Sequence, residues 1–230
     1  MAPSKTKYRS TEQEPHGDAV LERLEAVTIP KELKPYVAAF LAVHTDFGAK
    51  QKVVVATKQA RDAQVSAVID ADTAHDAAIG ELANDLVGAR LGARTSPFAA
   101  FSELTPSKHT SLPYKKQIAA SRALVKSVLA KKPAKAVATA ANRVAAAATK
   151  LEKAIAGLAR PQAAYDKALA NRDTLLPEWA LALDRLDRKA TGTWADDPAM
   201  VRTLFADPSA MEAGKTKRPK KKGKGEPKPA

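Results

Sequence analysis

The sequence contains no cysteine and few aromatic residues. Without cysteine, the chain has no disulfide bonds, thiol nucleophile or cysteine-ligated zinc or iron–sulfur site. Aromatic residues make up 5% of the 230 positions, and runs of β-branched residues such as Val53, Val54 and Val55 are nearly absent. Because strands are enriched in aromatic and β-branched residues, we predict a chain without a β-sheet.

Long apolar runs are also missing. The longest strongly apolar run, residues 36–43, is far shorter than the roughly 18 residues that span a bilayer. Residues 1–17 are polar and lack the apolar core of a standard secretory signal. We therefore expect a soluble, cytoplasmic protein without a transmembrane segment.

Alanine is abundant instead, at 49 of 230 positions. Alanine has the highest helix propensity of all residues, yet its small side chain fills little core volume. This composition predicts an all-α protein in which long helices approach one another closely around thin cores.

Apolar residues recur at heptad spacing through residues 137–190. Such a stripe requires a partner helix along its length. The polar residues Arg172 and Gln162 also fall on this stripe. Each marks a hydrated part of the stripe, the end of a helix, or a buried polar group that fixes the register of packing. The first series is Val137, Val144, Leu151, Leu158, Tyr165, Arg172, Trp179 and Leu186, and the second is Ala141, Ala148, Ile155, Gln162, Leu169, Leu176, Leu183 and Ala190.

A second long helix is predicted between Pro35 and Gly92, because no proline interrupts residues 36–91. It is either one helix of up to about 60 residues, roughly 90 Å long, or two helices broken near Gly48. In its middle the best heptad series is small and predicts close packing of two backbones: Val53, Ala56, Ala60, Ala63, Ala67, Ala71, Ala74 and Ala78.

These patterns predict an elongated antiparallel bundle, with coiled-coil-like packing of three to four long helices. We expect disorder at 1–17, a helical bundle over 18–206 and a disordered, basic Lys/Pro/Gly-rich tail over 207–230. Pro161 should bend the helix that contains it. Within the bundle we expect helices near 30–92, 114–131, 134–172, 175–190 and 196–206, with a connector at 93–114 in which Ser96 and Pro97 begin a short helix.

The net charge of +13 is concentrated in two regions. Residues 94–135 carry nine Lys and Arg against one Glu, and residues 214–230 carry eight against one. Together with residues 131–135 (KKPAK), the tail resembles linker-histone tails in composition, which implies contact with nucleic acid. Flexible cations neutralise phosphates and release counterions. The predicted polyanion-binding residues are Lys215, Lys217, Arg218, Lys220, Lys221, Lys222 and Lys224.

The four histidines offer weaker signals. Asp72 and His75 lie one helical turn apart, followed by Asp76, and di-metal helical bundles use a Glu-x-x-His spacing on two helices. The alternative that we favour places these residues on an exposed polar helix face. His16 and His109 fall in polar connectors, where we expect them to be solvated.

We find no catalytic or cofactor-binding motif, and we predict no enzymatic activity, cofactor or metal site. The sequence favours a non-enzymatic helical structural or interaction protein, a scaffold that its basic tail tethers to an anionic partner and that self-associates through its helices. The alternative is a sequence-nonspecific nucleic-acid-associated protein that uses the tail and the basic middle helices. A di-metal carboxylate bundle is a remote third hypothesis.

Overall fold

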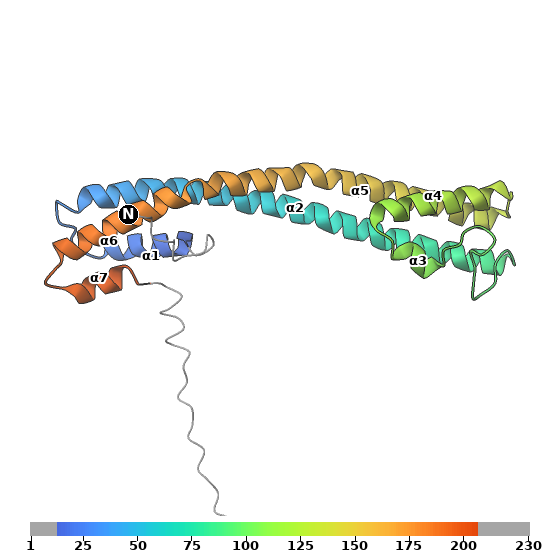
Figure 1. Cartoon of the computed structure of the whole chain (residues 1–230), viewed down its shortest axis with the longest axis horizontal. Coiled ribbons are helices and arrows are strands. Elements are labelled where there is room, and N and C mark those ends of the chain that lie inside the picture. Colours follow the sequence, from blue (N-terminus) through green and yellow to red (C-terminus); the bar gives the residue numbers. More distant parts are fainter. Residues whose placement is uncertain (1–12, 207–230) are drawn as a thin grey trace, which may run out of the picture. The chain divides into compact units, whose positions relative to one another are not determined.

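The computed structural model describes residues 13–206, and this part of the chain is helical (Figure 1). An isolated bridge between Ala93 and Ser96 is the only β-type pairing within these residues. The all-α prediction is therefore confirmed. The helices are α1 (Gln13–Glu25), α2 (Lys34–Gly88), α3 (Pro106–Thr110), α4 (Tyr114–Ala130), α5 (Lys135–Asp173), α6 (Leu176–Thr193) and α7 (Pro198–Leu204).

The described residues form two compact units, whereas the sequence was interpreted as one bundle. Unit 1 comprises residues 13–53 and 168–206, and unit 2 comprises residues 54–167. Helices α2 and α5 contribute residues to both. In unit 1, Trp179 lies in a core with Phe40, Phe47 and Leu186. In unit 2, α2, α4 and α5 enclose a core that includes Phe98 from the connector.

The predicted helix boundaries agree with the structure to within about four residues. Helix α2 runs without interruption through Gly48, and α5 continues through Pro161. Residues 1–12 and the tail over 207–230 lie outside the described residues. No helix among residues 13–206 combines the length and apolarity that crossing a bilayer requires.

Two local predictions were wrong. Residues 13–17 were expected to be disordered, but they belong to α1, where Gly17 is buried against His44 of α2. Tertiary packing thus orders a segment of polar composition. In the connector, the short helix is α3 and does not begin at Ser96. The side chain of Thr105 caps α3 by accepting a hydrogen bond from the Lys108 N–H (3.3 Å).

The heptad stripe of residues 137–190 is confirmed. In its first series all residues are buried except Leu158 and Tyr165, which are half-buried. The alanine stripe in the middle of α2 was wrong by one residue. Val53 is 53% exposed, whereas Val54 and Val68 are buried. The packed phase is the one that contains Val54 and Val68, and most alanines of the predicted series are exposed. The larger side chains outside that phase are exposed as well: Val53, Val55, Val65 and Ile69.

Candidate functional site: exposed cations, buried histidines and an apolar groove

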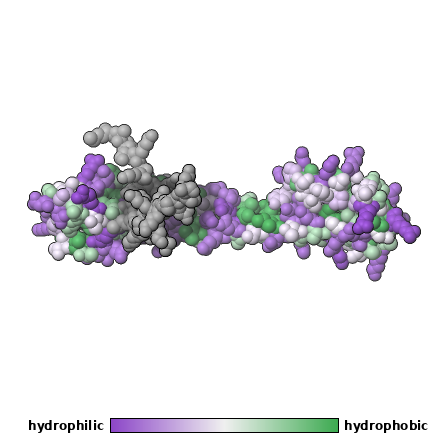
Figure 2. All heavy atoms as spheres, turned by 90° about the horizontal axis from the view of Figure 1, so that it is seen from below, coloured by the Kyte–Doolittle hydropathy of each residue, from purple (hydrophilic) through white to green (hydrophobic). Residues whose placement is uncertain are grey.

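Helices α4 and α5 give unit 2 a strongly cationic surface. Unit 2 contains 17 Lys and Arg against nine Asp and Glu, a net charge of +8. Residues 114–167 alone hold 12 of these cations and two acids, Glu152 and Asp166. On the face drawn in Figure 2, hydrophilic side chains spread over the surface of unit 2, at the right of the view. The excess of Lys and Arg over Asp and Glu therefore lies on the surface of a folded part of the chain.

Two of the 12 cations form ion pairs. Arg122 of α4 contacts Glu152 of α5 (Nη2–Oε2, 2.6 Å), and Arg143 contacts Glu81 (Nη1–Oε2, 3.1 Å). The hydrogen bond from Arg122 lowers the pKa of the Glu152 carboxyl, and that carboxylate raises the pKa of Arg122. Both pairs are exposed and therefore add little stability.

The other ten cations have no ion-pair partner within the described residues, and all are exposed. They are Lys115, Lys116, Lys126, Lys131, Lys132, Lys135, Lys150, Lys153, Arg160 and Lys167. The seven tail residues predicted to bind polyanions, Lys215, Lys217, Arg218, Lys220, Lys221, Lys222 and Lys224, lie outside the described residues. The described cations of α4 and α5 thus form a second candidate surface for an anion.

All four histidines are buried, although His16, His75 and His109 were predicted to be exposed. His75 is fully buried between α2 and α4. Its Nε2 lies 2.8 Å from Ser121 Oγ, and its Nδ1 lies 3.2 Å from Nε2 of Gln117. Gln117 and Ser121 are both fully buried. Neither was predicted as a site residue, because more than 40 positions separate them from His75 and no local motif marks them.

The Gln117 amide joins His75 to two carboxylates. Its Nε2 donates to Asp72 Oδ1 (3.2 Å) and Asp76 Oδ1 (3.0 Å) in addition to facing His75 Nδ1. An amide nitrogen has two hydrogens, one for each of these two carboxylates. Burial raises the pKa of Asp76, and the negative charge of Asp72 raises it further. These hydrogen bonds link α2 to α4. They give the buried side chains of His75, Gln117 and Ser121 polar partners, so a structural role accounts for the cluster.

The di-metal alternative gains no support from this cluster. Within residues 13–206 no three His, Asp or Glu side chains converge as ligands for a metal ion. His109, which was expected to be solvated, is fully buried, with its ring edge-to-face with Phe98 at 5.5 Å. Burial lowers the pKa of His109, and electrostatic interaction with His75 lowers it further.

In unit 1, His44 lies between an indole and a carboxylate. Trp179 Nε1 donates to His44 Nδ1 (3.0 Å), and His44 Nε2 lies 2.9 Å from Asp18 Oδ1. His16, also expected to be solvated, is 2% exposed, with its ring 6.5 Å from Trp179. These contacts tie α1 and α6 to α2.

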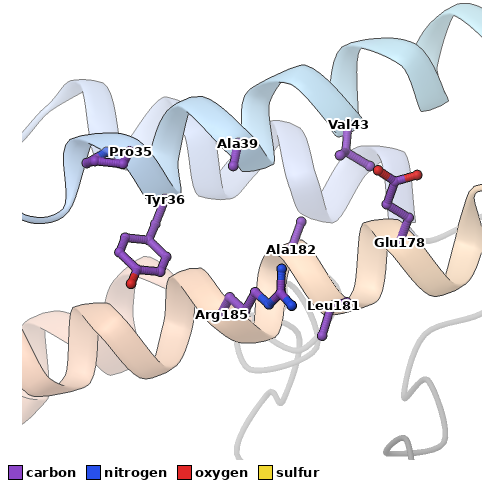
Figure 3. Close-up of a pocket in the computed structure, with 8 residues that line it drawn as sticks. All are labelled: Pro35, Tyr36, Ala39, Val43, Glu178, Leu181, Ala182 and Arg185. Carbon is purple, nitrogen blue, oxygen red and sulfur yellow. The ribbon is translucent and has the colours of Figure 1, made fainter.

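An apolar groove lies between α2 and α6 (Figure 3). Its volume is about 290 Å³, and it is lined by Pro35, Tyr36, Ala39, Val43, Glu178, Leu181, Ala182 and Arg185. Figure 3 shows Val43 at the Glu178 end of the groove and Tyr36 at the Arg185 end. Tyr36 and Leu181 are 38% and 47% exposed, so the groove presents apolar surface to solvent.

No family model, curated protein or solved structure matches this chain.

Proposed function

We propose that this chain is a non-enzymatic helical interaction protein, a scaffold that binds an anionic partner and associates with itself through its helices. The observation that carries the proposal is the set of ten exposed cations on α4, on α5 and in the turn between them, without an ion-pair partner in the described residues. Flexible cations bind phosphates and carboxylates with little demand on geometry. Under this proposal, the tail residues 215–224 tether the chain to the same partner.

Nucleic acid is the second candidate partner. Lys131, Lys132 and Lys135 lie at the turn between α4 and α5 and are all exposed. Three cations within five residues suit the closely spaced phosphates of a nucleic-acid backbone. Contacts to phosphate carry no sequence information, so the expected binding is independent of sequence.

The test is binding of labelled duplex DNA, single-stranded RNA and polyglutamate, measured by fluorescence anisotropy over a range of salt concentrations. Three proteins are compared: the full chain, a truncation to residues 1–213, and K131E/K132E/K135E. If these lysines contact phosphates of duplex DNA, the triple variant should lower the slope of log affinity against log salt by up to about 2.7.

The matched control is K31E/K34E/K52E, which makes the same change in charge at exposed lysines of unit 1. The proposal predicts a smaller loss for this control than for K131E/K132E/K135E. Equal binding of polyglutamate and DNA would favour a general anionic partner over nucleic acid. If the full chain binds none of the three ligands at low salt, the anion-binding proposal is wrong.

A further inference from the structure

The groove between α2 and α6 carries two opposite charges at its ends. Glu178 and Arg185 are both exposed, and neither has an ion-pair partner within the described residues. They are seven positions apart, about 10.5 Å along α6, which is too far for them to pair with each other. Tyr36 and Val43 of α2 are also separated by seven positions. The α6 wall of the groove thus carries Glu178 and Arg185 two helical turns apart, and the α2 wall carries Tyr36 and Val43 at the same separation.

We propose that this groove binds a second copy of the chain, packed antiparallel about a twofold axis. The proposal rests on the proposed function, because it names the surface through which the scaffold self-associates. With the axis between Leu181 and Ala182, Glu178 of each copy meets Arg185 of the other. At the centre, Leu181 meets Ala182, so a large side chain packs against a small one.

The walls formed by α2 obey the same symmetry. Antiparallel pairing about the point between Ala39 and Phe40 places Tyr36 of one copy against Val43 of the other. Because α2 and α6 run antiparallel with Val43 beside Glu178, one axis satisfies both pairs of helices. A parallel arrangement of the two copies would place Glu178 level with Glu178 and Arg185 level with Arg185. Charge complementarity therefore selects the antiparallel dimer.

Helix α1 contacts α2 at His44, which does not line the groove. The groove residues Tyr36 and Leu181 are exposed and therefore accessible to a second copy.

The test is sedimentation equilibrium of the full chain with two charge reversals, E178R and R185E. Each single variant places like charges together at both ends of the dimer, and we expect the Kd for self-association to rise at least about tenfold. An equal mixture of E178R and R185E restores opposite charges in the heterodimer and should associate like the wild type. The double variant E178R/R185E should also regain dimer formation.

The matched controls are D70R and K167E, which make the same charge changes at exposed positions of unit 2 that have no ion pair. We expect them to leave the Kd of the dimer unchanged. Circular dichroism identifies any variant that has lost its helices, and the mixing experiment separates a pairing defect from misfolding, because a misfolded variant gains nothing from its partner.

Three results would overturn the inference: a wild-type chain that stays monomeric at millimolar concentration, single variants that dimerise as the wild type does, or a mixture that associates no better than its components. Anion binding is measured on the same samples. A monomeric chain that still binds polyanions refutes the dimer alone, and a dimer that binds no polyanion refutes the anion-binding proposal alone.

Discussion

Trp179 donates its indole N–H to Nδ1 of His44 across 3.0 Å, in the core of unit 1. An indole nitrogen can only donate, so Nδ1 must hold the lone pair and the proton must be on Nε2. Nε2 in turn lies 2.9 Å from the Asp18 carboxylate. One residue from α6 therefore fixes the tautomer of a histidine in α2 and directs its remaining N–H toward α1.

Replacing Trp179 by Phe should destabilise the fold by about 2–3 kcal/mol, because His44 Nδ1 would be left buried without a donor and part of the ring volume would be lost. The matched control is W194F at the half-buried Trp194, for which we expect a loss below about 1 kcal/mol. Urea denaturation gives both values. Equal losses in the two variants would argue that the hydrogen bond to His44 contributes little.

Gly17 is required by the close approach of α1 to α2. A Cβ at residue 17 would overlap the His44 imidazole, whereas one at Gly80, also inside a helix, would meet no atom within 4 Å. We predict that G17A destabilises the chain by about 1–3 kcal/mol through overpacking. G80A should instead stabilise it by up to about 1 kcal/mol, because alanine has the higher helix propensity. Thermal unfolding of both variants measures the two effects. If G17A were stabilised, α1 would have to lie farther from α2 than the structure shows.

The phase of the α2 stripe can be tested by two identical substitutions. Val68 is 6% exposed and packs with Ile118, Ala148 and Leu151, whereas Val55 is 45% exposed. V68A should therefore cost about 1.5–3 kcal/mol, because it removes buried methyl groups and leaves a cavity. V55A should stay within about 0.5 kcal/mol. The free energies of unfolding in urea measure both, and equal losses in the two variants would show that Val68 does not lie on the packed face of α2.

The stability of unit 2 should depend on the titration of His109. Burial, with a smaller contribution from His75, lowers its pKa in the folded chain below the ordinary 6.5. The unfolded chain then binds the proton more readily. This contribution to stability is fully present above about pH 6.5 and is lost as the pH falls below that value toward the folded pKa. H109Q should lose less unfolding free energy than the wild type between about pH 7.5 and about pH 5.5.

Chemical denaturation at the two pH values provides this comparison. The raised pKa of Asp76 acts in the opposite direction: its stabilisation is complete below about pH 3.8 and declines as the pH rises through its folded pKa. Because both proteins contain Asp76, its effect cancels to first order in the difference between them. An identical loss in the wild type and H109Q would show that His109 titrates alike in the folded and unfolded chains.

Heptad spacing predicted the packed face of α5 and α6 because large apolar residues occupy one helical phase there and leave little choice. In α2 the same method failed. Two phases, one step apart, competed in its middle: an almost continuous alanine series and the sparser series of Val54 and Val68. The alanine series is the more regular of the two, yet Val54 and Val68 are the residues that pack, and the exposed Val53, Val55 and Val65 show that residue size alone did not mark the packed face.

The burial of the histidines could not be predicted for a different reason. His16 and His109 lie among polar residues, and their local sequence indicates exposure. The partner of His16 is Trp179 of α6, far away in the chain. The partners of His109 are Phe98 and Ser102, which lie shortly before it and meet it because the chain turns back on itself. His75 of α2 has its polar partners, Gln117 and Ser121, on another helix, α4. Sequence periodicity carries no information on which polar groups of two helices meet.

The sequence by itself determined the all-α class, the approximate ends of the helices, the packed stripe of residues 137–190 and the cationic middle of the chain. Propensity, proline positions and spacing act locally, so they can be read along the chain. Only the tertiary structure decided which flank of α2 receives α1, where α4 buries its polar side chains, and that Glu178 and Arg185 border one apolar groove with Tyr36 and Val43. These features depend on contacts between helices far apart in the chain, which are selected by the volume and charge of complete faces.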